Sequence, residues 1–146
     1  MTTRYAKQQV GVADGTAIPV KKADGREVNA KRSAILASKV TGVGWASGDV
    51  IFLGTKKAGD KVVDVKLTTG TSLGSSTVSV GTLAVPDKYA ATKTLTTVDT
   101  PTSLGPPAST LDADAPIAEE DLYATIGSAT IASGTRLTFE ICLVGL

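Results

Sequence analysis

The stretch that decides the fold runs from Asp49 to Tyr89 and reads DVIFLGTKKAGDKVVDVKLTTGTSLGSSTVSVGTLAVPDKY. It holds three short apolar segments, and the loops between them are rich in glycine, serine, threonine and lysine. This pattern is typical of β-strands joined by turns. We therefore predict three strands here, with the rest of the chain packed around them.

Alternation of side chains assigns the faces of these strands, because successive residues of a strand point to opposite sides. In 61–69, the inward set is Val63, Val65 and Leu67, and the outward set is Val62, Asp64, Lys66 and Thr68. In 77–83, Val78 and Val80 share one face. The turn-forming loop 70–76 predicts a hairpin between these two strands, and the strand at 49–53 is expected to stop at Gly54.

Further strands are expected on both sides of this stretch. Residues 122–131 and 137–146 predict a hairpin around 132–135, and a strand is favoured over a helix for 33–43. Four of the six prolines and six acids fall within 99–121, so this segment is predicted to be a long loop and not a central strand.

Composition agrees with an all-β domain and gives no sign of an enzyme. A chain of 146 residues fits one domain, and aromatic residues make up only 4 %, so the core must be built from aliphatic side chains. No histidine is present, which removes the commonest general base and metal ligand. The single cysteine, Cys142, is therefore interpreted as a packed or interface thiol rather than a nucleophile. No phosphate loop, dinucleotide fingerprint or catalytic triad motif is found, and no cofactor is predicted.

Charge is distributed unevenly along the chain. Residues 1–66 carry a net charge of +6, whereas residues 67–146 carry −5, which suggests a charged partner or pairing between copies. We predict a basic N-terminal arm or edge hairpin at 1–32, followed by a sandwich domain at 33–146. The arm either lies on a neighbouring subunit or is a solvated terminus. The candidate partner-binding residues are Arg4, Lys7, Lys21, Lys22, Arg26, Lys31, Arg32 and Trp45.

Two other features have a structural and a functional interpretation. Trp45, flanked by glycine and alanine, is expected to close the end of a core or an interface rather than to stack on a ligand. Acidic residues in the proline-rich segment could suggest a cation site, but their spacing does not match an EF-hand, and a solvated or partner-facing loop is favoured. These residues are Asp112, Asp114, Glu119, Glu120 and Asp121.

The order of several short segments resembles the small cement, or decoration, proteins that lock the heads of tailed bacteriophages. The segments are SGDVI at 47–51, KVVDV at 61–65, SSTVSVG at 75–81, PDKY at 86–89, DLYATIG at 121–127 and ASGT at 132–135. The resemblance covers about the last two-thirds of the chain. It implies a protein that sits on the outside of the expanded head and associates around local symmetry axes as dimers or trimers. The long basic N-terminus departs from the family pattern.

We therefore predict an antiparallel β-sandwich of jelly-roll type with an extended N-terminal arm. The predicted function is that of a structural virion protein that binds the outer capsid surface and bridges neighbouring major capsid protein subunits. A homodimer is favoured and a trimer stays open. The alternative is a carbohydrate-binding module of a tail or fibre, with Trp45, Tyr89 and Tyr123 as a stacking platform. No membrane span, signal peptide or direct nucleic-acid contact is expected, so the protein should stay where it is made. The resemblance implies that it is made in the host bacterial cytoplasm and lies on the outer surface of the virion capsid.

Overall fold

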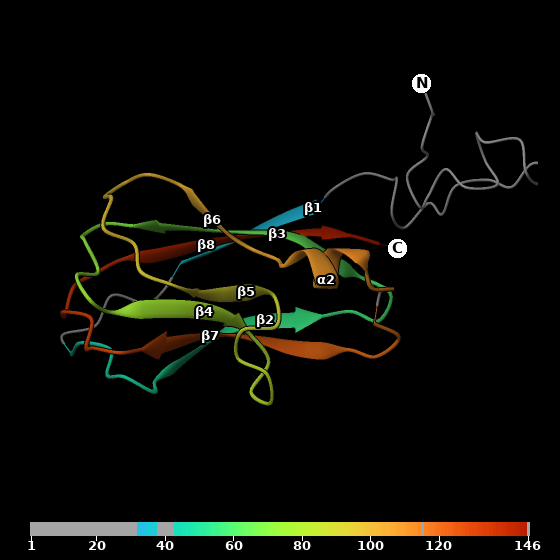
Figure 1. The fold of residues 1–146 in the computed structure, drawn as a ribbon, viewed down its shortest axis with the longest axis horizontal. Coiled ribbons are helices and arrows are strands. Elements are labelled where there is room, and N and C mark those ends of the chain that lie inside the picture. Colours follow the sequence, from blue (N-terminus) through green and yellow to red (C-terminus); the bar gives the residue numbers. More distant parts are fainter. Residues whose placement is uncertain (1–31, 38–42, 115, 146) are drawn as a thin grey trace, which may run out of the picture.

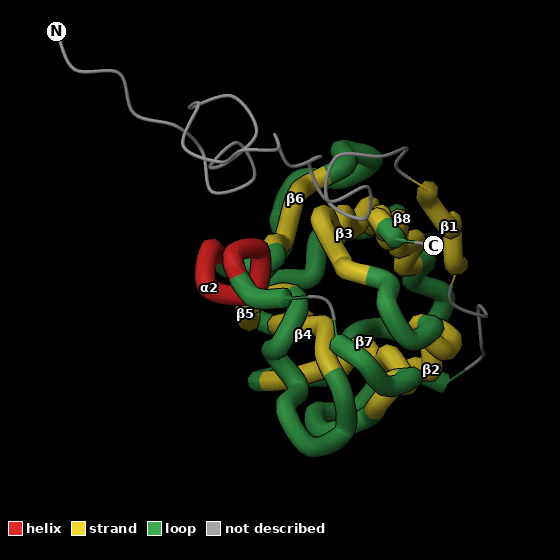
Figure 2. The backbone as a smooth tube through the Cα atoms, turned by 90° about the vertical axis from the view of Figure 1, so that its right-hand side faces the viewer, coloured by secondary structure: helices red, strands yellow, loops and turns green. Residues whose placement is uncertain are grey.

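The computed structural model describes residues 32–37, 43–114 and 116–145. The strands within them are β1 (Arg32–Ala37), β2 (Val50–Lys56), β3 (Lys61–Thr69), β4 (Thr77–Gly81), β5 (Ala90–Lys93), β6 (Thr102–Gly105), β7 (Glu120–Gly127) and β8 (Leu137–Val144), with one short helix, α2 (Ala108–Asp112). The strands form two four-stranded sheets, β1-β8-β3-β6 and β2-β7-β4-β5. Figure 1 shows the sheets stacked as two layers, with α2 near the end of β3, and Figure 2 shows α2 beside β5.

The strand order is that of a jelly roll. Antiparallel pairs join β1 to β8, β2 to β7, β3 to β6 and β4 to β5. The chain is thus one long folded hairpin whose successive strand pairs fall in alternate sheets. Additional pairing of β3 with β8 and of β4 with β7 completes each sheet. The prediction of an antiparallel, all-β sandwich of jelly-roll type is confirmed.

Both predicted local hairpins are wrong. Strands β3 and β4 lie in different sheets, and so do β7 and β8, so the loops after β3 and after β7 cross between the layers. A loop rich in glycine and serine permits either a tight reversal or a crossover. Side-chain alternation reports which face is buried, but it does not identify the strand that pairs alongside.

The faces of β3 match the prediction over most of its length. Val65 and Leu67 are fully buried, as expected, but Val62 is buried at 1 % exposure whereas Val63 is only half-buried. A register shift between Val62 and Asp64 opposite β8 explains the difference. One extra residue in a β-bulge reverses the alternation on its N-terminal side. Val63 was therefore assigned to the wrong face.

Other element boundaries also differ from the predictions. Strand β2 does not stop at Gly54 but continues to Lys56, because Gly54 adopts a φ of 118° where the register with β7 shifts. The strand expected to reach Leu83 ends at Gly81. The preference for a strand near the start of 33–43 is confirmed by β1.

The proline-rich segment 99–121 is not a plain loop. It holds the four-residue strand β6 and helix α2, and its last two residues begin β7. Strand β6 lies at the edge of its sheet, between Pro101 and Pro106. Proline is tolerated there because an edge strand leaves part of its backbone unpaired. The segment was expected to form no central strand, and its own strand, β6, does lie at the edge of a sheet.

Candidate partner-binding surface

Most of the predicted basic site lies outside the described residues. Arg4, Lys7, Lys21, Lys22, Arg26 and Lys31 all fall in 1–31, so their role stays a prediction. Arg32 opens β1, and its guanidinium donates to the Asp60 carboxylate in the turn between β2 and β3. The Asp60 side chain is 4 % exposed and that of Arg32 is 49 % exposed. Arg32 thus ties the edge strand β1 to the sandwich while half of its side chain still faces solvent.

Trp45 packs against the hydrophobic core. It is half-buried and packs against the buried apolar cluster between the sheets. Its backbone exchanges two hydrogen bonds with Ile131, at 2.9 Å from Trp45 N to Ile131 O and 2.8 Å in the reverse direction. The expectation that Trp45 packs on a core or an interface is met by its contact with the core, and its role in partner binding stays a prediction.

A charged cluster lies at the end of the sandwich where β2 ends and β7 begins. Lys56 pairs with Glu120 in the strand register, and its Nζ lies 3.9 Å from the Glu120 carboxylate. The same carboxylate accepts hydrogen bonds from Lys88 Nζ and from the Tyr89 hydroxyl. Because the Lys56 side chain has no exposed surface, Glu120 compensates a buried cation. Through its bonds to Lys88 and Tyr89, Glu120 also holds the segment before β5 in place.

The pKa values of Lys56, Tyr89 and Glu120 all differ from their ordinary values, because these groups are partly buried next to one another. Burial lowers the pKa of Lys56, although the negative charge of Glu120 opposes this. Burial alone would raise the pKa of Glu120, but the hydrogen bonds from Lys88 and Tyr89 and the positive charges of Lys88 and Lys56 together outweigh it, and the net shift is downward. Burial, together with the hydrogen bond to Glu120, raises the pKa of the Tyr89 hydroxyl. At neutral pH, Glu120 is therefore ionised and Tyr89 is a hydrogen-bond donor.

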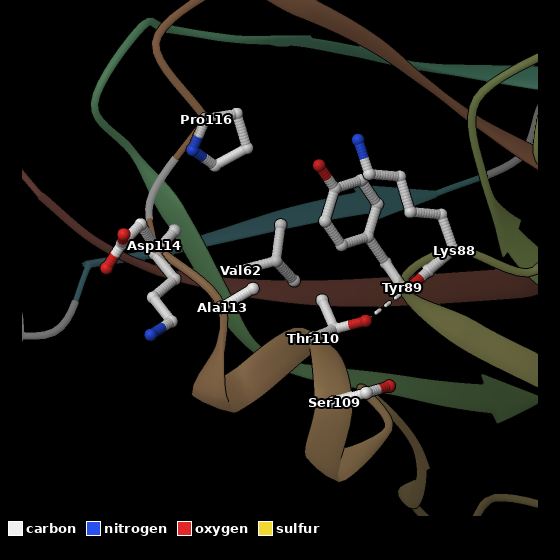
Figure 3. A pocket seen from close by; sticks show the side chains of 9 residues that line it. Val62, Lys88, Tyr89, Ser109, Thr110, Ala113, Asp114 and Pro116 are labelled. Carbon is white, nitrogen blue, oxygen red and sulfur yellow. Dashed lines mark hydrogen bonds between the residues drawn. The ribbon is translucent and has the colours of Figure 1, made fainter. Parts of the chain in front are cut away.

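A pocket of about 180 Å³ adjoins this cluster, between α2 and the sheets (Figure 3). Val62, Ala113 and Pro116 give it an apolar lining. The Thr110 hydroxyl donates to the Lys88 carbonyl at 3.0 Å, so it holds the helix against the segment before β5. The side chains of Lys88, Tyr89 and Thr110 are engaged in hydrogen bonds that stabilise the fold. None of these three forms a pair of nucleophile and general base.

The described residues assemble neither a cluster of metal ligands nor the sugar platform considered as the alternative. Across 32–37, 43–114 and 116–145, no three histidine, cysteine or acidic side chains come together as a metal site. Tyr89 is 2 % exposed, so its ring cannot present a stacking face, while the Tyr123 ring pairs with Phe52 at a centroid distance of 5.4 Å. Cys142 is a buried free thiol, as expected. In the described part of the chain, no helix is long and apolar enough to cross a membrane.

Exposed apolar side chains mark a surface that sequence analysis did not single out. Val50 and Phe52 on β2 are 44 % and 56 % exposed, and Leu83 and Val85 in the loop after β4 are 62 % and 47 % exposed. The signal was present in the run LAVP at 83–86, four apolar residues directly before Asp87. It was missed because Leu83 was assigned to the end of a buried strand.

The fold places this chain in the class of single jelly-roll sandwiches. By sequence, it matches no family model, and no curated protein is significantly similar to it. By structure, it is similar to a chain in the capsid of Ralstonia phage GP4, with a TM-score of 0.63 and 13 % identity over 81 % of this chain and 86 % of that chain.

Chains of two further phage capsids share the fold. A chain of the cyanophage Pam1 capsid asymmetric unit has a TM-score of 0.60 and 10 % identity, with 80 % of this chain and 84 % of that chain covered. A chain of the acid-stable capsid of Helicobacter pylori bacteriophage KHP30 has a TM-score of 0.56 and 16 % identity, with coverage of 80 % and 88 %. At these identities, the likeness is one of fold.

Proposed function

We propose that this chain is a structural virion protein that binds the outer surface of a phage head. In this role, it bridges neighbouring major capsid protein subunits and so stabilises the shell. The observation that carries the proposal is the fold shared with chains of three phage capsids, over at least 80 % of this chain and at least 84 % of each of the others. Since each alignment covers most of both chains, those capsid chains are similar to this one in length.

Two further observations support a cement role within the head. The order of short segments in the last two-thirds of the chain resembles cement proteins, as described above. The described residues also form a packed two-layer core, with a buried thiol and with Lys56 and Glu120 paired to each other, as expected of a structural protein. A single jelly roll of this kind is suited to adding contact area at joints between shell subunits, which must be broken before a filled head can burst.

The basic arm is the proposed attachment to the shell. The last residue of the predicted arm, Arg32, is also the first residue of the edge strand β1, which lies in the upper sheet of Figure 1. Lysine and arginine side chains there would meet acidic groups of the capsid surface, and exposed pairs of this kind are screened by salt. Under this proposal, the protein is made in the host cytoplasm, has no membrane partner and acts on the outside of the particle without contacting nucleic acid.

The test compares heads with and without the protein. We expect heads that lack it to release DNA at a lower temperature than decorated heads, and purified protein added back to restore the difference. Bare heads incubated with an arm-truncated chain that no longer attaches provide the matched control. Equal thermal durability of bare and decorated heads would contradict the stabilising role.

A further inference from the structure

Each sheet of the sandwich has two edge strands, and three of these four edges carry features that prevent further pairing. The edges are β1 and β6 in one sheet and β2 and β5 in the other. Strand β2 is interrupted by the register shift beside Gly54. Strands β5 and β6 have four residues each and lie against each other, and Lys93 Nζ donates to the Ser103 carbonyl at 3.1 Å. Bulges, short strands and lysine side chains commonly keep an edge from pairing with another strand.

Strand β1 has none of these features. Its six residues, Arg32–Ala37, include no proline or glycine and pair with β8 in an unbroken register. Within the described part of the chain, β8 is the only strand that pairs with it. In an antiparallel pair, every second residue bonds to the partner strand, so the other residues of β1 direct their N–H and C=O groups outward. Such an edge selects an extended chain, because another strand matches the spacing of these groups.

An apolar pocket of about 80 Å³ lies beside β1, between the two sheets. Its lining comes from β1 and β8 in one sheet and from β2 and β7 in the other: Ala34, Leu36, Ile141, Leu143, Leu53, Gly54, Thr55, Lys56 and Leu122. Ala34 lines the pocket and is also exposed, so the pocket is open to solvent at this edge. A strand added at the usual spacing of about 4.8 Å from β1 would lie along the opening, with every second side chain directed toward the pocket.

We propose that an extended segment of the major capsid protein adds to the sandwich as a strand beside β1. Its backbone pairs with the outer edge of β1, and one of its aliphatic side chains fills the pocket. A cavity of about 150 Å³ holds a benzene molecule, so about 80 Å³ suits one aliphatic side chain. Backbone bonds supply the affinity of such a contact, and the pocket supplies its specificity. The inference rests on the proposed function and names the kind of shell segment that is bound.

The position of Arg32 favours the shell protein as the source of the added strand. Arg32 is the last residue of the proposed attachment arm and the first residue of β1. Because consecutive Cα atoms are about 3.8 Å apart, an attached arm holds the start of β1 at the shell surface. An arm that lies on the shell also leaves the outer edge of β1 open to a strand of the shell protein.

Residues of the arm itself match this edge less well. The arm contains the turn sequence Asp-Gly at 24–25. A two-residue hairpin loop there would set Gly15 and Asp14 opposite Ala34 and Ile35. Glycine and aspartate are unfavourable in strands, and neither would fill an apolar pocket. The edge is therefore assigned to the shell protein and not to the arm.

Amide hydrogen exchange of the full-length chain, free and bound to bare heads, tests the strand addition. In the free chain, about half of the amides in 32–37 should exchange fast, because β8 pairs with every second residue only. Binding to heads should slow the exchange of these amides at least about tenfold. The amides of β6, the opposite edge of the same sheet, are the internal control and should be unchanged.

A pair of variants tests the pocket. Ala34→Leu fills the pocket from this chain's own side, so we expect the dissociation constant for bare heads to rise at least about tenfold. The matched control is Ser33→Leu, which adds an apolar group at the neighbouring residue, on the opposite face of β1. This control should change the dissociation constant by less than about twofold, and thermal melting should show that both variants are folded. Equal binding by the wild type and Ala34→Leu would overturn docking into the pocket.

The outcomes separate this inference from the proposed function. A chain that binds heads without added protection at 32–37 overturns the strand addition and leaves the proposed function standing. A chain that binds no heads contradicts both. Protection of all these amides in the free chain also overturns the inference. If that protection is independent of protein concentration, the occupant is residues 1–31, and if it grows with concentration, the occupant is a second copy.

Discussion

Replacing Glu120 by glutamine should remove the group that holds one end of the sandwich together. The substitution keeps the size of the side chain but removes its charge. Lys56, with no exposed side-chain surface, would lose a carboxylate 3.9 Å from its Nζ. Lys88 and Tyr89 would each lose a charged hydrogen-bond acceptor. We therefore expect a loss of folding stability.

The expected loss follows from the burial of the groups involved. Removing one partner of a buried ion pair costs about 3–5 kcal/mol, because the other charge stays buried without compensation. The Glu120 side chain is 20 % exposed, so we expect the lower end, about 3 kcal/mol. For a domain of this size, 1 kcal/mol corresponds to roughly 3–6 °C, so the melting temperature of E120Q should fall by roughly 10 °C or more.

The loss is measured by thermal and urea unfolding, with circular dichroism as the signal. A second substitution tests its cause. Lys56→Met removes the buried cation, so the double variant K56M/E120Q should be more stable than E120Q. Tyr89→Phe, which removes one hydrogen bond and no charge, is the control and should cost about 1 kcal/mol. The reasoning would be refuted if E120Q melted within a degree or two of the wild type, or if K56M added to the loss.

The pH dependence of the same pair of proteins gives an independent check. The folded-state pKa of Glu120 is lowered, so its contribution is present above the ordinary carboxyl value of about 4.5 and is lost as pH falls through the folded-state pKa. The difference in unfolding free energy between wild type and E120Q should therefore shrink below about pH 4.5. A difference that stays constant into acid would mean that the charge of Glu120 is not what stabilises the fold.

Three further predictions concern packing and attachment. Val62→Asp should cost several kcal/mol and prevent folding, whereas Val63→Asp should be far milder; equal effects in a denaturation assay would contradict the bulge in β3. Gly81→Ala should lower stability by about 1–3 kcal/mol, because its Cβ would collide with the backbone of the loop after β4. The control is Gly70→Ala, whose Cβ would have its nearest neighbour at 3.6 Å and which should change stability by less than about 0.5 kcal/mol. Removal of residues 1–31 should leave the melting temperature unchanged but weaken co-sedimentation with shells, and unchanged binding would exclude the arm as the attachment.

The fold class could be predicted from sequence because its signals are local. Alternation in 61–69 located a strand with the bounds that the structure shows, and Val65 and Leu67 were correctly assigned to the core. The scarcity of aromatic residues and the many turn residues indicated an aliphatic β-sandwich. Prolines around β6 excluded a central strand there. Each of these inferences depends on neighbours in sequence.

What could not be predicted depends on contacts between distant residues. Hairpins and crossovers use the same turn residues, so the pairing of β3 with β8 rather than β4 is set by the whole jelly roll. The bulge at Val62 is defined only against its partner strand. Likewise, the Glu120 cluster joins Lys56 and Lys88, which are far from it in the chain, and the acids around Glu120 were interpreted only as a loop or cation site.

Cryo-electron microscopy of native particles that carry this protein tests the central claim most directly. The account predicts density for the two-layer sandwich on the outer surface of the head, with each copy contacting at least two neighbouring shell subunits. Density for the sandwich on the tail or its fibres, or on the head but against a single shell subunit, would contradict the proposed bridging role.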